Sequence, residues 1–393
     1  MLYLDVSSSC KSPLNTGVQR MVRGLFAALS RRTAVVPILW NDKLNSYCRL
    51  SSREHRFLVK PFARHRAPSA KPEQVVIRFP WSKTIRHFRN RKRQFALEIA
   101  ATTDDVLFVP EIFRDKRIHQ FTAPARRFPG RCYAVFHDAI ALRLPDLTAQ
   151  DHQPNFAEYV RALGAFDKVV CVSCEVENDL QHYWTSLGVS RMPTAVLGWP
   201  TDFGKDRPDA LPRFDTRRIL CVATLERRKN HLKLLEAAET LWAGGLDFEL
   251  VLVGRMTADW GATVLTEANR LVDQGRPLKW LRHISDQALH QAYHDCSFTV
   301  YPSVREGFGL PILESLWHGR PCVCGANGAL GEVSAGGGCL TVTCADTNAV
   351  ADGMRQLLTD RALYDRLFAE ARQRRFRSWD DYTNALLHEI NAA

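Results

Sequence analysis

The chain alternates short apolar runs with longer helical patterns, and this alternation limits its possible folds more than any other feature. In the first half, runs rich in Val, Leu and Ile lie at residues 2–6, 34–40, 104–110, 132–138 and 168–173. In the second half they recur at 217–225, 248–254, 278–284 and 298–304. Apolar strands separated by helices are typical of sheets covered by helices on both faces. Because the pattern occurs twice, we expect two doubly wound α/β layers.

The length of the chain also indicates two domains. Its 393 residues exceed what one ordinary hydrophobic core supports. Residues 197–215 are rich in Pro, Gly and Asp, as interdomain linkers often are. We therefore expect a first domain over residues 1–200 and a second over residues 201–375. Ligands of such sheets bind beyond the carboxyl ends of the strands, here in a cleft between the two domains.

The basic residues are distributed unevenly along the chain, whose formal net charge is +11. Residues 1–195 hold 30 Lys and Arg against 17 Asp and Glu, whereas residues 196–393 hold 23 against 25. This asymmetry predicts an anionic partner for the first half: a phosphorylated substrate, an acidic membrane surface or nucleic acid. The segment RHFRNRKRQ, which includes Arg86 to Arg93, is either a contact for anionic lipid or an exposed helix face. Nucleic acid is disfavoured because no recognisable binding module is present.

The N-terminal residues do not resemble a signal peptide. The segment MLYLDVSSSCKSP carries an early Asp5 and lacks a basic start. No run approaches the 18 apolar residues of a membrane span. We expect a cytoplasmic protein, with peripheral contact to the inner membrane face as a further hypothesis, and reduced cysteines. The single CxxC pair, Cys171 and Cys174, is more typical of buried strand-end residues than of a metal site.

The segment REGFGLPILE, residues 305–314, has the pattern of a loop that leads into a helix. Pro311 suits the first helical turn. The backbone N–H groups near Phe308–Leu310 would then lie at a helix N-terminus, which favours phosphate. Gly307 and Gly309 would allow a ligand to approach the backbone closely. The segment therefore predicts a phosphate site.

Two carboxylates bracket this loop. Glu306 precedes the glycines, and Glu314 lies in the first turns of the expected helix. Carboxylates accept paired hydrogen bonds from hydroxyl groups. A phosphate site beside two such groups suits a ligand with a phosphate and many hydroxyls, such as a nucleotide-sugar. The alternative at this point is an exposed loop acid and an ordinary acidic residue in a helix.

On these residues the chain resembles glycosyltransferase family 4, whose members are retaining, metal-independent enzymes with the GT-B fold. The segment from Glu306 to Glu314 is similar to the E-x7-E motif of that family, and VATLERRKN at 222–230 resembles its GTLEPRKN segment. VFHDAIALRLPD at 135–146 resembles the HD segment of the acceptor domain. TGVQRMVRGL at 16–25 resembles the glycine loop and helix near the acceptor.

The resemblance implies a role for each matching residue. Glu306 would contact hydroxyls of the donor sugar and Glu314 the ribose, while Arg228 and Lys229 would hold the donor diphosphate. His137 would orient the donor sugar or the acceptor. The implied catalytic residues are His137, Glu306 and Lys229; the donor-binding residues are Arg228, Lys229, Glu306, Gly307, Phe308, Gly309, Leu310 and Glu314; the acceptor-side residues are Thr16, Gly17, His137 and Asp138.

Some of these assignments have alternatives. Thr224 stands where many family members carry an arginine near the diphosphate, so Arg228 is the expected substitute. His137 could instead be a strand-end histidine bonded to backbone. Asp138 could be a helix cap or turn residue instead of a ligand.

The resemblance also implies the fold and the activity. We expect two Rossmann-like domains facing a cleft, with a C-terminal helix over residues 376–393 packing on the first domain; the helical pattern itself covers 369–390. The activity would be that of a retaining hexosyltransferase with no cofactor and no metal, since no acidic pair suggests a convincing Mg²⁺ site. The donor would be a nucleotide-diphosphate sugar, with mannosyl or rhamnosyl favoured. The acceptor would be a glycan or a lipid-linked diphosphate in cell-surface polysaccharide synthesis (O-antigen, capsule or exopolysaccharide).

Two other functions stay open at this stage. A GT-B nucleotide-sugar epimerase would consume the donor without an acceptor, and the paired TLERRKN and EGFGLPILE segments argue against it. A catalytically silent GT-B binding subunit would consume no donor, and the substitution at Thr224 leaves room for that function.

Overall fold

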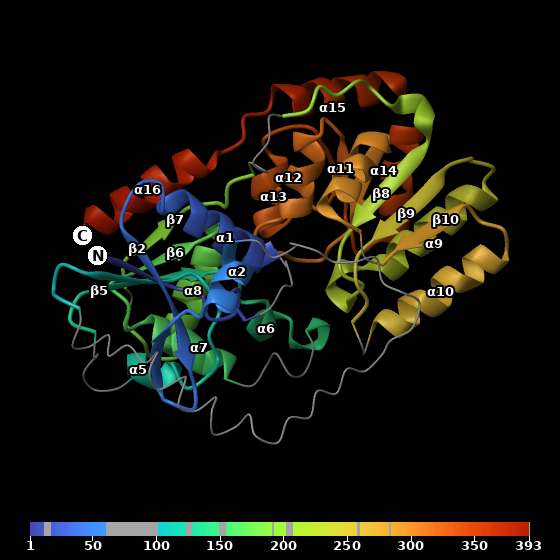
Figure 1. Cartoon of the computed structure of the whole chain (residues 1–393). Coiled ribbons are helices and arrows are strands. Elements are labelled where there is room, and N and C mark those ends of the chain that lie inside the picture. The colour runs from blue at the N-terminus through green and yellow to red at the C-terminus, as the bar shows by residue number, and fades with distance from the viewer. Residues whose placement is uncertain are drawn as a thin grey trace.

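The chain forms two α/β layers that stand side by side (Figure 1). The computed structural model describes residues 1–11, 17–59, 101–122, 128–148, 155–190, 192–201, 207–257, 260–282 and 284–392. Thr16 and the basic segment at 86–94 lie outside the described residues. Within the described ranges, no helix is long and apolar enough to span a membrane.

The first layer is built on a sheet whose described strands run in the order β3-β2-β1-β4-β5-β6-β7. They are β1 (Leu2–Asp5), β2 (Val35–Asn41), β3 (Ser46–Arg49), β4 (Val106–Val109), β5 (Arg131–Phe136), β6 (Lys168–Cys171) and β7 (Thr194–Val196). All pairs are parallel except β2 with β3, which form an edge hairpin. The sequence did not predict β3 or β7, because both are short strands at the sheet edges.

Helices cover the faces of this sheet. They are α1 (Gly17–Leu29), α2 (Ser52–Val59), α5 (Ile118–Thr122), α6 (Ile140–Arg143), α7 (Phe156–Leu163) and α8 (Cys174–Ser186), with a 3-10 turn η1 (Pro145–Leu147). In α1 the buried residues Met21, Val22, Leu25 and Leu29 recur at helical spacing, which gives the helix one apolar face for the core. The opposite face of α1 is left for polar contacts.

The second layer is built on an all-parallel sheet in the order β10-β9-β8-β11-β12-β13 within the described residues. Its strands are β8 (Arg218–Val222), β9 (Glu249–Val253), β10 (Leu278–Leu281), β11 (Phe298–Tyr301), β12 (Cys322–Cys324) and β13 (Cys339–Thr341). The strand order reverses between β8 and β11. Such a switch point leaves a crevice at the carboxyl ends of the two strands, where ligands of open α/β sheets bind.

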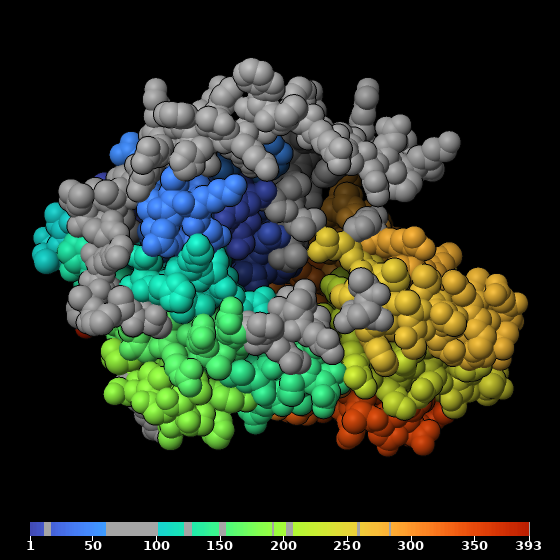
Figure 2. All heavy atoms as spheres, turned by 90° about the horizontal axis from the view of Figure 1, so that it is seen from below, coloured from blue at the N-terminus to red at the C-terminus, as the bar shows by residue number. Residues whose placement is uncertain are grey.

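The helices of the second layer complete the doubly wound arrangement. They are η3 (Phe214–Thr216), η4 (Arg227–Lys229), α9 (His231–Ala243), α10 (Gly261–Asp273), α11 (Asp286–Asp295), α12 (Leu310–Trp317), α13 (Gly328–Ser334), α14 (Thr347–Thr359) and α15 (Arg361–Gln373). Seen from below, the two layers are separate lobes, with dark blue atoms of the first residues visible in a hollow between them (Figure 2).

The chain then returns to the first layer. Helix α16 (Trp379–Asn391) buries Tyr382, Leu386 and Ile390 in the first hydrophobic core. The Tyr133 hydroxyl donates to the Ile390 carbonyl at 2.9 Å. The predicted architecture is therefore confirmed, including the terminal helix on the first domain. The helical pattern at 369–390 is wrong in one respect: α15 and α16 are separate, because Ser378 caps a new helix.

Candidate active site

Glu306 lies at the centre of a cluster of charges in the crevice beyond β8 and β11. One carboxylate oxygen lies 2.6 Å from Nη1 of Arg228, and the other lies 2.5 Å from Nζ of Lys229. The Tyr301 hydroxyl donates to the carboxylate at 2.8 Å and accepts from Lys229 at 2.7 Å. The Ser303 hydroxyl also donates to it. The structure thus brings together three residues that the sequence assigned to the donor site.

The local fold explains why these residues meet. Strands β8 and β11 are neighbours, so the loops that follow them lie side by side. Arg228 and Lys229 occupy the single turn η4, and the Arg228 carbonyl accepts from the N–H of Val304 at 2.9 Å. Asn230 then adopts φ 59° and begins α9, which leaves the basic pair facing the second loop.

Burial and neighbouring charges act in opposite directions on the pKa values of this cluster. Burial alone raises the pKa of the Glu306 carboxyl, but the charges of Arg228 and Lys229 outweigh it and hold the pKa well below its usual value. Burial and the neighbouring Arg228 lower the pKa of Lys229, and Glu306 opposes this change. Burial also disfavours the Arg228 cation, yet Glu306 and Glu226 raise the pKa of Arg228 above its usual value.

Glu314 lies one turn inside α12. Gly309, at φ 106°, precedes this helix, and Pro311 lies in its first turn, as the sequence predicted. The Glu314 carboxylate is almost fully buried, accepts a hydrogen bond of 2.9 Å from the Tyr293 hydroxyl, and forms an ion pair with Arg20 of α1. Because Arg20 belongs to the first domain, this ion pair joins the two domains.

The glycine loop between these carboxylates is pressed against the first domain. A side-chain carbon added at Gly307 would lie 2.0 Å from the carbonyl oxygen of His137, so only glycine fits there without movement. The Ser173 hydroxyl donates to the Gly307 carbonyl at 2.8 Å. Phe308 packs against the first hydrophobic core. The loop therefore lies at the interface of the two domains.

His137 follows β5 and is buried in the first domain. Its Nε2 lies 2.7 Å from the Pro110 carbonyl oxygen, and its ring stacks on Trp199. Burial lowers the pKa of His137, so the ring is neutral at pH 7. Asp138 accepts from the N–H of Ile140 at 3.0 Å, as a turn residue does. Both backbone-bonded roles that the sequence left as alternatives are thus present.

Other partners in the site were not predicted from sequence. Tyr301, Ser303, Tyr293 and Arg20 hold the two glutamates. Only Tyr301 has a recognisable signal, since it ends the strand that delivers Glu306. A side-chain carbon at Gly17, a residue expected on the acceptor side, would lie 3.7 Å from Cδ1 of Leu310, so the start of α1 meets the start of α12.

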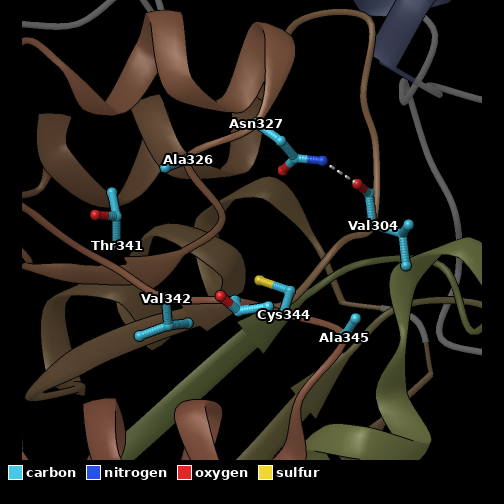
Figure 3. A pocket seen from close by; sticks show the side chains of 8 residues that line it. Val304, Ala326, Asn327, Thr341, Val342, Cys344 and Ala345 are labelled. Carbon is cyan, nitrogen blue, oxygen red and sulfur yellow. Dashed lines mark hydrogen bonds between the residues drawn. The ribbon is translucent and has the colours of Figure 1, made fainter.

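A cavity of about 490 Å³ lies next to this cluster (Figure 3). It is lined by Val304, Ala326, Asn327, Thr341, Val342, Thr343, Cys344 and Ala345. The Asn327 amide donates to the Val304 carbonyl at 2.8 Å and closes one side of it. The cavity is uncharged, and neither glutamate lines it. Among the described residues, no group of three or more His, Cys, Asp and Glu side chains is arranged to hold a metal ion.

Comparisons with known sequences identify relatives for much of the chain. Residues 202–374 match the family model described as glycosyl transferases group 1. O-antigen chain mannosyltransferase B of Escherichia coli is 34% identical over 299 residues, covering 70% of this chain and 74% of that protein. Serotype-specific mannosyltransferase WbdA of Escherichia coli is 29% identical over 214 residues. This match covers 49% of the chain but only 25% of that longer protein.

Comparisons with solved structures extend over both domains. Sucrose-phosphate synthase of Thermosynechococcus elongatus has a TM-score of 0.66 at 17% identity, covering 100% of this chain and 99% of that one. A trehalose-6-phosphate structure from E. coli, bound with UDP-2-fluoro glucose, has a TM-score of 0.65 at 14% identity with the same coverage. At such low identity these likenesses show the fold alone, and they confirm the two-domain GT-B arrangement.

Proposed function

The chain belongs to the family of group 1 glycosyltransferases, and from this premise we propose that it moves a hexosyl group from a nucleotide-diphosphate sugar to a glycan with retention of anomeric configuration. The observation that carries the proposal is the cluster in which Glu306 contacts Arg228 and Lys229 at the switch point of the second sheet. The cluster combines cations for a diphosphate with a carboxylate for sugar hydroxyls. The two mannosyltransferase relatives favour mannose as the sugar, with rhamnose second.

The leaving group determines the first requirement of the site. Breaking the bond between the anomeric carbon and the phosphate oxygen leaves a diphosphate with additional negative charge. Lys229 and Arg228 stabilise that charge, together with the backbone N–H groups at the start of α12. Lys229 is held in place before the reaction by Glu306 and Tyr301, and Arg228 is held by Glu306. Because side-chain cations supply the stabilisation, we propose that the reaction needs no metal.

The sugar determines the second requirement. Ionised Glu306 accepts hydrogen bonds from its hydroxyls and lies near the positive charge that develops on the ring. In front-face attack, the acceptor oxygen bonds to the anomeric carbon on the side that the diphosphate leaves. The acceptor proton passes to a diphosphate oxygen, so no protein nucleophile is needed. Neutral His137, held through Nε2 on Pro110, orients the sugar or the acceptor without acting as a base.

The first domain supplies the acceptor side. We place there a glycan or a lipid-linked diphosphate glycan of cell-surface polysaccharide synthesis, such as an O-antigen, because one relative is an O-antigen chain mannosyltransferase. The excess of Lys and Arg in residues 1–195 supports an anionic acceptor and peripheral contact with the inner membrane face from the cytoplasm. Of the residues assigned to the acceptor side, Gly17, His137 and Asp138 lie in the described part of the chain.

Donor consumption tests the proposal. The chain is incubated with GDP-mannose and a panel of other nucleotide-sugars, with and without a lipid-linked glycan acceptor, in buffer containing EDTA. We expect release of nucleoside diphosphate from one donor only when the acceptor is present. Donor isomerisation without acceptor would indicate an epimerase, and no consumption with any pair would indicate a binding subunit. Loss of activity in EDTA, restored by Mg²⁺ or Mn²⁺, would contradict metal independence.

A further inference from the structure

The charges around the expected diphosphate site already compensate one another. Arg228 donates to Glu226 at 2.7 Å and to the Arg305 carbonyl at 2.8 Å, in addition to its ion pair with Glu306. Lys229 is paired with Glu306 as well. Two cations thus face two carboxylates, and the side chain of Arg228 is only 16% exposed. A diphosphate that enters this site meets two cations that are each already paired with a carboxylate, so a third cation nearby would strengthen its binding.

Arg20 is placed to be that cation. It lies on the first turn of α1, which begins where α12 begins, as the contact between Gly17 and Leu310 shows. In Figure 1, α1 is on the side of the first domain that faces α12 and α13. The Arg20 side chain is 28% exposed, and its guanidinium is bound to Glu314. Glu314 is four residues into α12, about 6 Å along the axis from the helix start.

The partners of Glu314 allow an exchange. Its carboxylate has two oxygens: one accepts from the Tyr293 hydroxyl and the other from Arg20. Ribose hydroxyls can donate to the oxygen that Arg20 occupies, while Tyr293 keeps the other. The Arg20 guanidinium, which is charged throughout, is then no longer paired with Glu314. It lies beside the N-terminus of α12. A guanidinium matches phosphate oxygens with two parallel hydrogen bonds.

We propose that Arg20 is a ligand of the donor diphosphate, supplied by the first domain and held on Glu314 until the nucleotide binds. The proposal rests on the proposed function, because it assigns a role within the same donor site. It also links nucleotide binding to the contact between the domains. The ribose hydroxyls replace Arg20 as partners of Glu314, and the diphosphate then contacts cations of both domains. The rival explanation is that Arg20 only joins the domains, and that Arg255, exposed on the loop after β9, binds the diphosphate.

Calorimetric binding of UDP, GDP, uridine and guanosine separates the two explanations. The variants are Arg20→Gln, Arg20→Lys and Arg255→Gln. Arg32→Gln is the control, because this arginine lies in the turn after α1 and contacts Asp380 of α16. We expect Arg20→Gln to weaken binding of the preferred nucleoside diphosphate by about tenfold or more, since one charge-assisted contact is lost. Binding of the nucleoside should stay the same or tighten, because Glu314 loses its competitor.

The possible results distinguish a diphosphate ligand from a residue that only joins the domains. Arg20→Lys keeps the charge, so it should lose less affinity for the diphosphate than Arg20→Gln does. The lysine variant also serves as a control for misfolding of the glutamine variant. If Arg20→Gln binds the diphosphate as tightly as wild type, or if Arg255→Gln alone weakens it, the inference is wrong and the proposed function stands. If wild type binds neither UDP nor GDP, nor any other nucleoside diphosphate, the proposed function fails and the inference fails with it.

Discussion

Glu306 is the residue on which the charged groups of the cleft converge. Its carboxylate joins Arg228 and Lys229, which follow β8, to Tyr301 and Ser303, which belong to its own strand end. A buried carboxylate between two cations stays ionised only while its partners remain. Loss of the negative charge therefore affects the position of the two cations, as well as the sugar contact that we propose for Glu306.

We predict that Glu306→Gln lowers kcat for transfer by roughly a hundredfold to a thousandfold, because it removes an electrostatic contact that the transition state uses. Lys229→Ala should cause a loss of similar size. Glu239→Gln, on the surface of α9, is the matched control and should keep wild-type turnover. Steady-state kinetics on variants with unchanged thermal unfolding is the measurement. Near-normal turnover by both site variants would place the donor elsewhere.

A second residue-scale prediction concerns His231, a fully buried histidine at the start of α9. Neither ring nitrogen has a hydrogen-bond partner among the described residues, and burial lowers the pKa of His231 to about 3. At pH 5 the unfolded chain protonates this ring and the folded chain does not, so folding loses about 2 kcal/mol between pH 7.5 and pH 5. His231→Leu should remove this part of the acid destabilisation, as measured by urea unfolding at both pH values. An unchanged difference between the two pH values would contradict it.

The residues of the site differ in how far sequence could predict them. Two short motifs predicted the donor-binding residues, because the spacing within each motif is recognisable in the sequence. These residues are Glu306, Glu314, Arg228 and Lys229. Arg20 could not be predicted as a partner of Glu314, because the two are 294 residues apart and meet only where the domains dock. Thr16 lies outside the described residues, and its role on the acceptor side stays a prediction.

At the scale of elements, two segments join the domains. The loop from β11 into α12 contacts the first domain, and the terminal helix α16 packs into the core of that domain. The strands with long apolar runs were predicted from sequence, and several of them, such as β4 and β11, are buried on both faces. Strands β12 and β13 were not predicted, because three residues are too few to show a period. The break between α15 and α16 was also missed, although Ser378 and Asp381 form a capping box that sequence can reveal.

This capping box gives an element-scale prediction. The Ser378 hydroxyl accepts from the Asp381 N–H at 3.0 Å, and the Asp381 carboxylate accepts from the Ser378 N–H at 3.0 Å. Ser378→Ala should lower the free energy of unfolding by about 1 kcal/mol, since it leaves a helix N–H without its partner. Ser186→Ala, at the exposed end of α8, is the control and should have a smaller effect. If both variants lower the free energy of unfolding in urea by the same amount, the capping box makes no stabilising contribution of its own.

At the scale of the whole molecule, the two domains meet through loops at the carboxyl ends of their sheets. The Glu332 carboxylate of α13 accepts from the N–H groups of Cys174 and Glu175, at 2.9 and 2.7 Å, and so caps α8 of the first domain. The ion pair between Arg20 and Glu314 makes a second connection. The first domain, which carries the excess positive charge, therefore meets a second domain that is close to neutral.

The charge asymmetry predicts binding to anionic membranes. Wild type should sediment with anionic vesicles at low salt and less at physiological salt, since exposed charges are screened over about 8 Å there. Changing Arg89, Arg91, Lys92 and Arg93 to Gln should weaken binding by about 1 kcal/mol per residue. These residues lie outside the described part of the chain. The control makes the same charge change at exposed positions of the second domain, namely Lys279, Arg355, Arg361 and Arg366. Equal binding by both variants would exclude the basic segment as the contact.

The most direct test of the central claim is the anomeric configuration of the product, read by NMR on the first sugar transferred from an α-linked nucleotide-sugar in the presence of EDTA. The account predicts an α linkage, because the acceptor attacks on the face that the diphosphate leaves and Lys229 and Arg228 replace a metal. A β linkage formed by the wild-type chain, lost in Glu306→Gln, would keep the site but contradict the retaining mechanism.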